Sequence, residues 1–197
     1  MKLIQTRTAL MAALAISALA AAGCTSMAGM DAGSDTQATV MVGGAPMYPT
    51  KTIVENAVSS RDHTTLVAAV TAAGLVPTLS GPGPFTVFAP TNAAFAKLPA
   101  GAVESLVQPA NKAILTKILT YHVVPGRVSA ADLIGRIRAG GGRASLTTVE
   151  GGTLTASLRG DAVILTDEKG GVATVIQADV FQSNGVIHVT DTVSMPN

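Results

Sequence analysis

The run TVFAPTNAAF, residues 86–95, carries the clearest structural signal in the sequence. Its first half, which contains Phe88, is β-branched and aromatic and therefore favours a strand. The strand is expected to end at Pro90, because proline cannot donate a hydrogen bond to the neighbouring strand. Thr91 then stands where a helix N-cap belongs, and Phe95 is expected to pack inward from that helix. The run predicts a strand that passes directly into a helix.

A second informative run is NGVIHVTD, residues 184–191. Asn184 and Gly185 both tolerate the positive φ of a tight turn, and apolar segments flank them on either side. This combination predicts a β-hairpin with the pair at its turn. In the strand that follows, the alternation of side chains places His188 on one face, with Ile187 and Val189 on the other.

A third run, TYHVV at residues 120–124, marks the junction of two elements. An amphipathic helix is expected over residues 111–120, and Val123 and Val124 begin an extended segment before Pro125. Tyr121 and His122 stand between the helix and that segment.

The rest of the chain changes character along its length. Apolar residues at helical spacing predict helices in the first part, including one that Asp62 caps and Gly74 ends. The C-terminal third is β-branched and divided by glycine-rich turns, and it predicts strands at 146–149, 153–158, 162–166, 172–181 and 186–193. Helices followed by strands indicate an α+β fold.

The three runs, in this order and at this spacing, resemble the signature segments of the fasciclin family. The resemblance covers about residues 48–196, and it departs from the family at Ala93, where many members carry an acidic residue. It implies an α+β fold in which antiparallel sheets form a wedge or sandwich, with several short helices packed against it.

The resemblance also implies a function, because fasciclin-like domains are implicated in cell adhesion and in contacts with matrix or partner proteins. The contact surface it suggests is Tyr121, His122, Val123 and Val124. The remaining motif residues are expected to be structural: Phe88, Pro90, Thr91, Phe95, Asn184, Gly185 and His188. The alternative function is a carrier or sensor of a small apolar ligand in the cell envelope, which would need an apolar cavity.

Composition argues against a nucleic-acid partner. The formal net charge is +1, from 13 Lys and Arg against 12 Asp and Glu, and there is no run of basic residues. A nucleic-acid-binding surface needs a basic stripe that displaces counterions. Aromatic residues make up only 3% of the chain, so stacking platforms for bases are scarce as well.

The N-terminus has the parts of a secretory signal peptide. Lys2 and Arg7 precede an apolar run, which ends in small residues just before Cys24. This arrangement resembles a lipoprotein signal of residues 1–23, with Cys24 carrying a lipid that anchors the chain in the cell envelope, at the outer membrane in a Gram-negative host. Ordinary cleavage after Ala22, with a periplasmic or secreted product, is the alternative. Residues 24–47 are expected to form a flexible tether and residues 48–196 the folded domain.

The sequence offers little for catalysis. The histidines His63, His122 and His188 lack the spacing of a zinc site, and no nucleophile or P-loop motif is present. We expect His122 and His188 to hydrogen-bond to the backbone and His63 to be exposed. A non-catalytic protein without cofactor or metal is the resulting expectation.

Overall fold

The computed structural model describes residues 39–197. The predicted signal peptide and Cys24 lie outside these residues. The strands are β1 (Val40–Val42), β2 (Ala45–Met47), β3 (Phe85–Pro90), β4 (Val123–Pro125), β5 (Arg143–Thr147), β6 (Thr153–Arg159), β7 (Ala162–Thr166), β8 (Val172–Gln182) and β9 (Gly185–Thr190). The α-helices are α1 (Ile53–Ser59), α2 (Thr64–Ala73), α3 (Val76–Leu79), α4 (Asn92–Ala96), α5 (Ala102–Leu106), α6 (Lys112–Tyr121) and α7 (Ala130–Ala139), with 3-10 turns at Arg61–His63 and Pro109–Asn111.

One seven-stranded sheet organises residues 85–190, in the order β4-β3-β9-β8-β7-β6-β5. Strand β8 belongs to both halves of this sheet, and its register shifts twice between Val175 and Val180. Such bulges bend a strand, so the two halves form a wedge. The Val149 N–H donates to the carbonyl of Val123 at 2.7 Å, which links the segment after β5 to β4 at the opposite end of the strand order.

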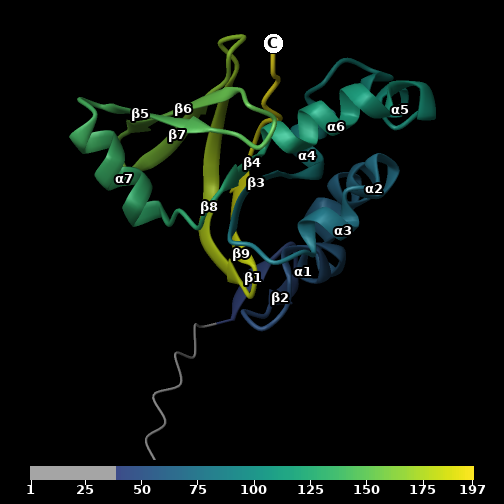
Figure 1. Ribbon diagram of the computed structural model, residues 1–197, viewed down its shortest axis with the longest axis horizontal. Helices are drawn as coiled ribbons and strands as arrows, with labels where there is room; N and C mark the ends of the chain where they lie inside the picture. The colour runs from purple at the N-terminus through teal and green to yellow at the C-terminus, as the bar shows by residue number, and fades with distance from the viewer. Residues whose placement is uncertain (1–38) are drawn as a thin grey trace, which may run out of the picture. The chain divides into compact units, whose positions relative to one another are not determined.

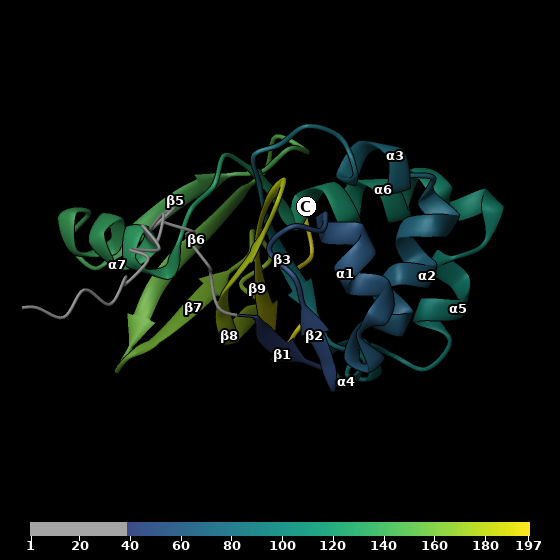
Figure 2. The same cartoon turned by 90° about the horizontal axis from the view of Figure 1, so that it is seen from below.

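Helices cover the two halves of the wedge unequally. Figures 1 and 2 show α7 beside β5, β6 and β7, whereas α1 to α6 lie on the other side, beside β3 and β9. Two apolar clusters follow this division, one between the α1–α6 helices and β3, β8 and β9, and one that joins α7 to the strands β5 to β8. The predicted α+β class with several short helices is confirmed.

The sheet differs from the prediction in one pairing. Strands β3 and β9 lie side by side in parallel, with Phe88 opposite His188, while the other pairs are antiparallel. A parallel pair joins segments far apart in the chain, and no local pattern of apolar residues reports it.

The expectation of a flexible tether over residues 24–47 is wrong for its last part. Strands β1 and β2 form a hairpin, whose turn at Gly43 and Gly44 has the positive φ values that glycine allows. Val42, Ala45 and Met47 are buried in the larger core. These few apolar residues lie in a stretch rich in Gly, Ala and Ser. Their packing against the larger core is a tertiary contact, which the composition of the stretch does not indicate.

The start of α2 also differs from the prediction. Asp62 lies in the preceding 3-10 turn, and the helix begins at Thr64 with no cap from its own segment. Asn92 takes this role from α4, because its Oδ1 accepts a hydrogen bond from the Thr65 N–H at 3.0 Å. None of the helices within residues 39–197 has the length and apolar character needed to cross a membrane.

Candidate functional site

The three sequence runs meet where β3 lies between β4 and β9. Val87 is opposite Val123 in the antiparallel pair, and Phe88 is opposite His188 in the parallel pair. The Phe88 N–H donates to the carbonyl of His122 at 2.9 Å, so all three runs are joined through one strand. This junction is the first place to look for a site.

Tyr121 lies at the end of α6 with its ring fully buried. Its hydroxyl donates to the Thr153 carbonyl at 2.7 Å and accepts from the Glu168 N–H at 3.2 Å. Burial raises the pKa of this phenol to about 12, so it stays protonated. The ring also explains Gly152, because a Cβ there would lie 2.7 Å from Tyr121 Cε2. Tyr121 therefore fastens α6 to the far half of the sheet.

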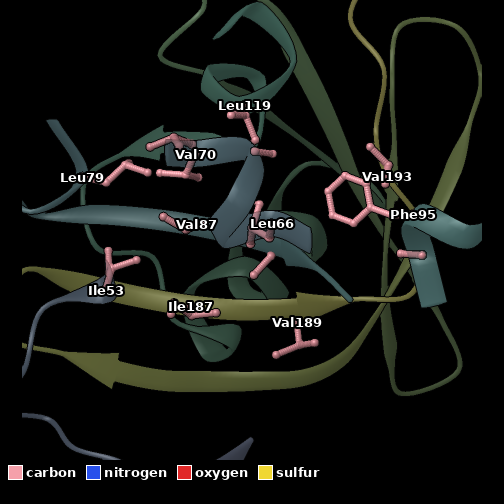
Figure 3. Close-up of a cluster of buried hydrophobic side chains, with 14 of the residues drawn as sticks. Ile53, Leu66, Val70, Leu79, Val87, Phe95, Leu119, Ile187, Val189 and Val193 are labelled. Atoms are coloured by element: carbon pink, nitrogen blue, oxygen red, sulfur yellow. The ribbon is translucent and has the colours of Figure 1, made fainter. Parts of the chain in front are cut away.

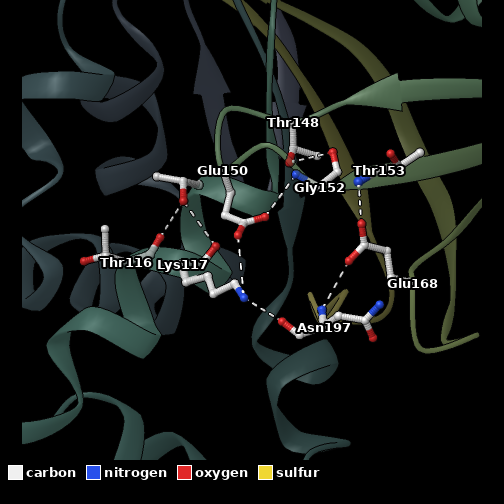
Figure 4. Close-up of polar contacts among 9 residues, drawn as sticks. Thr116, Lys117, Thr148, Glu150, Gly152, Thr153, Glu168 and Asn197 are labelled. Carbon is white, nitrogen blue, oxygen red and sulfur yellow. Dashed lines mark hydrogen bonds and ion pairs between the residues drawn. The ribbon is translucent and has the colours of Figure 1, made fainter.

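A polar cluster surrounds this attachment at the chain end (Figure 4). Lys117 Nζ donates to the Asn197 carbonyl at 2.6 Å and lies 3.7 Å from a Glu150 carboxylate oxygen. Glu168 accepts from the N–H groups of Thr153 and Asn197, and these bonds hold its pKa below the ordinary value. The cluster connects the C-terminus to the loops that Tyr121 contacts. Its charged side chains bond to other groups of the same chain.

His122 caps α6 with both ring nitrogens engaged. Nδ1 lies 2.8 Å from the Ile118 carbonyl, to which it donates, and Nε2 accepts from the Ser194 N–H at 3.0 Å. Burial lowers the pKa of the ring, although the Ile118 bond and Asp167 act in the opposite direction. The ring is therefore a neutral connector between α6 and the C-terminal segment.

His188 plays the same part on β9. Nε2 donates to the Val128 carbonyl at 2.9 Å, and Nδ1 accepts from the Asp179 N–H at 3.3 Å. Its ring stacks on Phe88 with centroids 5.6 Å apart. Burial lowers its pKa, against the influence of Val128 and Asp179. The predicted backbone hydrogen bonds of His122 and His188 are thus both present.

Asn184 and Gly185 form the hairpin from β8 to β9, but not in the predicted way. The turn residues are Ser183 and Asn184, and neither Asn184 nor Gly185 has a positive φ. Asn184 instead accepts from the Ile53 N–H at 3.0 Å and donates to the carbonyl of Leu79 at 2.8 Å. The side-chain amide of Asn184 connects α1 and α3 to the start of β9. These tertiary hydrogen bonds, and not the geometry of the turn, explain why asparagine stands here.

The helix after β3 forms as predicted. Pro90 is the last residue of β3, and the Thr91 hydroxyl accepts from the Ala94 N–H at 3.2 Å to cap α4. Phe95 is buried in the larger core. These three residues shape the exit from β3, which is a structural role.

The predicted contact surface is wrong. Tyr121, His122, Val123 and Val124 are each at most 5% exposed, so no partner can reach their side chains without unfolding this region. His63 also differs from the prediction, because it is buried and its Nδ1 lies 2.9 Å from the Ser60 hydroxyl. These four residues belong to the core, as apolar and aromatic residues at a helix–strand junction commonly do.

Sequence reasoning did not locate the hollow beside this junction. A cavity of about 310 Å³ lies among α1, α2, α3, β3 and the end of α6, with walls that are almost entirely carbon. The alternative function required an apolar cavity without locating one, because its walls come from six elements, including β4 through Val123, and only the fold assembles them. Within residues 39–197 no three His, Cys, Asp or Glu side chains cluster as metal ligands would.

A wedge-shaped sheet with short helices on both halves, tied together through buried Tyr and His side chains, defines an α+β domain. Comparison with known proteins gives the family: the Fasciclin domain family matches residues 61–196, and the chain belongs to this family.

The chain is similar to two members of this family in sequence and to one solved structure in fold. It is 50% identical to the Synechocystis protein sll1483 over 165 residues, which are 82% of each chain. It is 37% identical to the cell surface glycolipoprotein MPB83 of Mycobacterium bovis over 122 residues, 62% of this chain and 48% of that one. The fold matches that of a FAS1 domain pair from the insect cell adhesion molecule Fasciclin I, with a TM-score of 0.65, 18% identity and coverage of 73% of this chain and 50% of that chain.

Proposed function

We propose that this protein is an exported, non-catalytic module that binds a protein of the cell surface or the surrounding matrix. Support comes from its family, in which one relative is named a cell surface glycolipoprotein and one solved structure comes from a cell adhesion molecule. The observation that carries the proposal is the internal use of the motif residues, whose polar atoms bond within the domain. Contacts are therefore left to the exposed surface.

Exposed apolar side chains are the strongest candidates for that contact. Met41 on β1 is 57% exposed and Ile176 on β8 is 58% exposed. The two strands are held together here, since Gln177 Nε2 donates to the Met41 carbonyl at 3.0 Å. Methionine is enriched in protein interfaces, and the buried centre of an interface is more apolar than the rest of the protein surface. We assign the contact to this surface, which we call the β1–β8 face and define by Met41, Ile176 and Gln177.

Photo-cross-linking on intact cells tests this function. The full chain carries a benzophenone amino acid in place of Ile176, and in a matched control in place of Arg138, an exposed residue on α7. The proposal predicts a discrete cross-linked product from position 176 and none from position 138. A second variant carries the benzophenone at Met41. If neither position 176 nor position 41 gives a product, the β1–β8 face is not a contact surface.

Lipidation of Cys24 is a separate proposal that explains how the module stays at the envelope. Cys24 follows Ala22 and Gly23 at the end of the apolar signal, and two acyl chains would anchor a chain stably where one would not. Labelling with radioactive palmitate should mark the wild-type chain and leave Cys24→Ser unmarked and released from the membrane fraction. Unlabelled wild type would mean that ordinary signal cleavage occurs.

A further inference from the structure

The apolar cavity next to the β3–β4 junction is lined by residues from six elements, namely α1, α2, α3, α6, β3 and β4. Its deep wall is formed by Val87 and Phe88 on β3 and by Leu119 near the end of α6. Figure 3 shows Ile53, Leu66, Val70, Leu79, Val87 and Leu119 gathered in one cluster from α1, α2, α3, β3 and α6. Protein interiors contain few voids larger than a water molecule, so 310 Å³ is not ordinary packing.

The polar atoms in the cavity wall are already bonded within the protein. The wall contains two polar side chains, Thr71 and His122. The Thr71 hydroxyl donates to the Val67 carbonyl at 2.8 Å, and the ring nitrogens of His122 are taken by Ile118 and Ser194. The wall therefore offers a guest a carbon surface with no free side-chain hydrogen-bond donor, and the only side-chain acceptor left is the hydroxyl oxygen of the exposed Thr71.

This wall chemistry selects among occupants. Water needs two to four polar partners to stay in a cavity, which these side chains do not supply. A peptide segment would bury amide groups without hydrogen bonds, and such burial is costly. A hydrocarbon gives up no hydrogen bond on entry and gains apolar burial.

We propose that this cavity binds a small apolar molecule, a single hydrocarbon chain of about a dozen carbons. The length follows from volume, because a cavity of about 150 Å³ holds benzene with its six carbons and this cavity has about 310 Å³. The site is separate from the β1–β8 face, so ligand binding does not depend on the protein contact proposed above.

The cavity reaches the surface between α1 and α2. Val58 on α1 and Thr71 on α2 both line it and are both exposed. A chain entering here keeps a terminal polar group at the mouth, where water can solvate it. The ligand class is therefore a single-chain amphiphile, such as a medium-chain alcohol or acid, with its apolar part inside.

Displacement of the fluorescent probe N-phenyl-1-naphthylamine from the purified full chain tests the site. Primary alcohols of increasing length should compete, with affinity rising about fourfold per methylene and levelling near a dozen carbons, when the cavity is full. Levelling distinguishes a cavity of limited volume from adsorption to exposed apolar surface. Absence of saturable probe binding, or affinity that rises without levelling through about sixteen carbons, overturns the proposal.

A matched pair of variants places the binding in this cavity. Ala57 lines the cavity from α1, while Ala68 is exposed on α2 and does not line it. Ala57→Leu should weaken probe binding by at least about tenfold because the added carbons fill the space, and Ala68→Leu should bind as the wild type does. Val67→Phe fills the cavity from α2 and serves if Ala57→Leu does not fold. Folded Ala57→Leu or Val67→Phe protein that binds the probe with wild-type affinity refutes the assignment.

Discussion

Gly185 lies where the hairpin, β3 and α1 come closest together. A Cβ at this position would overlap the Phe85 carbonyl oxygen and lie 2.9 Å from Ile53 Cδ1. The residue is glycine because of this close approach and not because of its φ. Sequence reasoning identified Gly185 and gave the wrong cause, since a turn pair can be recognised locally and a backbone contact 100 residues away cannot.

Replacing Gly185 with alanine should therefore destabilise the protein. We expect Gly185→Ala to lower the free energy of unfolding by about 1–3 kcal/mol, because the backbone of β3 or the Ile53 side chain must move. Gly135 is the matched control, since a Cβ there meets open space within α7. Gly135→Ala should raise the free energy of unfolding by about 0.5–1 kcal/mol. Urea denaturation measures both, and equal effects of the two changes would contradict the packing described here.

The buried histidines give the protein a characteristic pH dependence. Burial is the main cause that lowers the pKa values of His63, His122 and His188 in the folded state. The unfolded chain, with a histidine pKa of about 6.5, then binds more protons than the folded chain below that pH. The free energy of unfolding is highest above pH 6.5 or so and falls as pH drops through the folded-state values.

Urea denaturation at two pH values tests this. Each histidine contributes a loss of at most about 1.4 kcal/mol per pH unit between its two pKa values, so stability should be clearly lower at about pH 5.5 than at about pH 7.5. The carboxylates with lowered pKa values, such as Glu168, act only at lower pH, since free carboxylates titrate near about 4. Equal stability at both pH values would show that the imidazoles are not held neutral.

Among the elements, the hairpin of β1 and β2 gives a direct test of whether residues 40–47 are part of the folded domain. Met47 is 3% exposed in the larger core, whereas Met41 on the partner strand is 57% exposed. Met47→Ala should cost about 2–5 kcal/mol through lost burial and a cavity, and Met41→Ala should change stability by less than about 0.5 kcal/mol. If thermal and urea unfolding find the two variants alike, the hairpin is the loose tether that composition indicates.

Elements were predictable to the extent that their signals are local. Thr91 marks the start of α4 in the sequence, and its side chain accepts the expected capping bond. The β-branched runs gave strands β6 to β9, with shifted ends. The parallel pairing of β3 with β9 and the cap that Asn92 lends to α2 were not predictable, because each joins segments that only the tertiary structure brings together.

The same limit applied to the candidate site. Tyr121 and His122 stand out in the sequence because of their polar atoms, yet both are buried and bonded within the protein. Whether a side chain is buried depends on the assembled wedge, and the sequence gives only the type of each residue. The cavity among α1, α2, α3, α6, β3 and β4 was not predictable for the same reason, since no single element contains it.

At the scale of the whole molecule, the motif residues form an internal framework that ties α6, β3, β9 and the C-terminus together. Under the proposed function, the contact with a partner is made by the exposed β1–β8 face. Tyr121→Phe removes two buried hydrogen bonds and should lower the free energy of unfolding by about 1–3 kcal/mol. Ile176→Glu changes an exposed side chain and should leave stability within about 0.5 kcal/mol of the wild type.

Binding of the purified full chain to intact cells, measured for these two variants at a temperature where both are folded, tests that division directly. We expect wild-type binding by Tyr121→Phe and lost binding by Ile176→Glu. The reverse result, in which folded Tyr121→Phe protein fails to bind and Ile176→Glu binds normally, would place the contact at the Tyr121 motif and exclude the β1–β8 face.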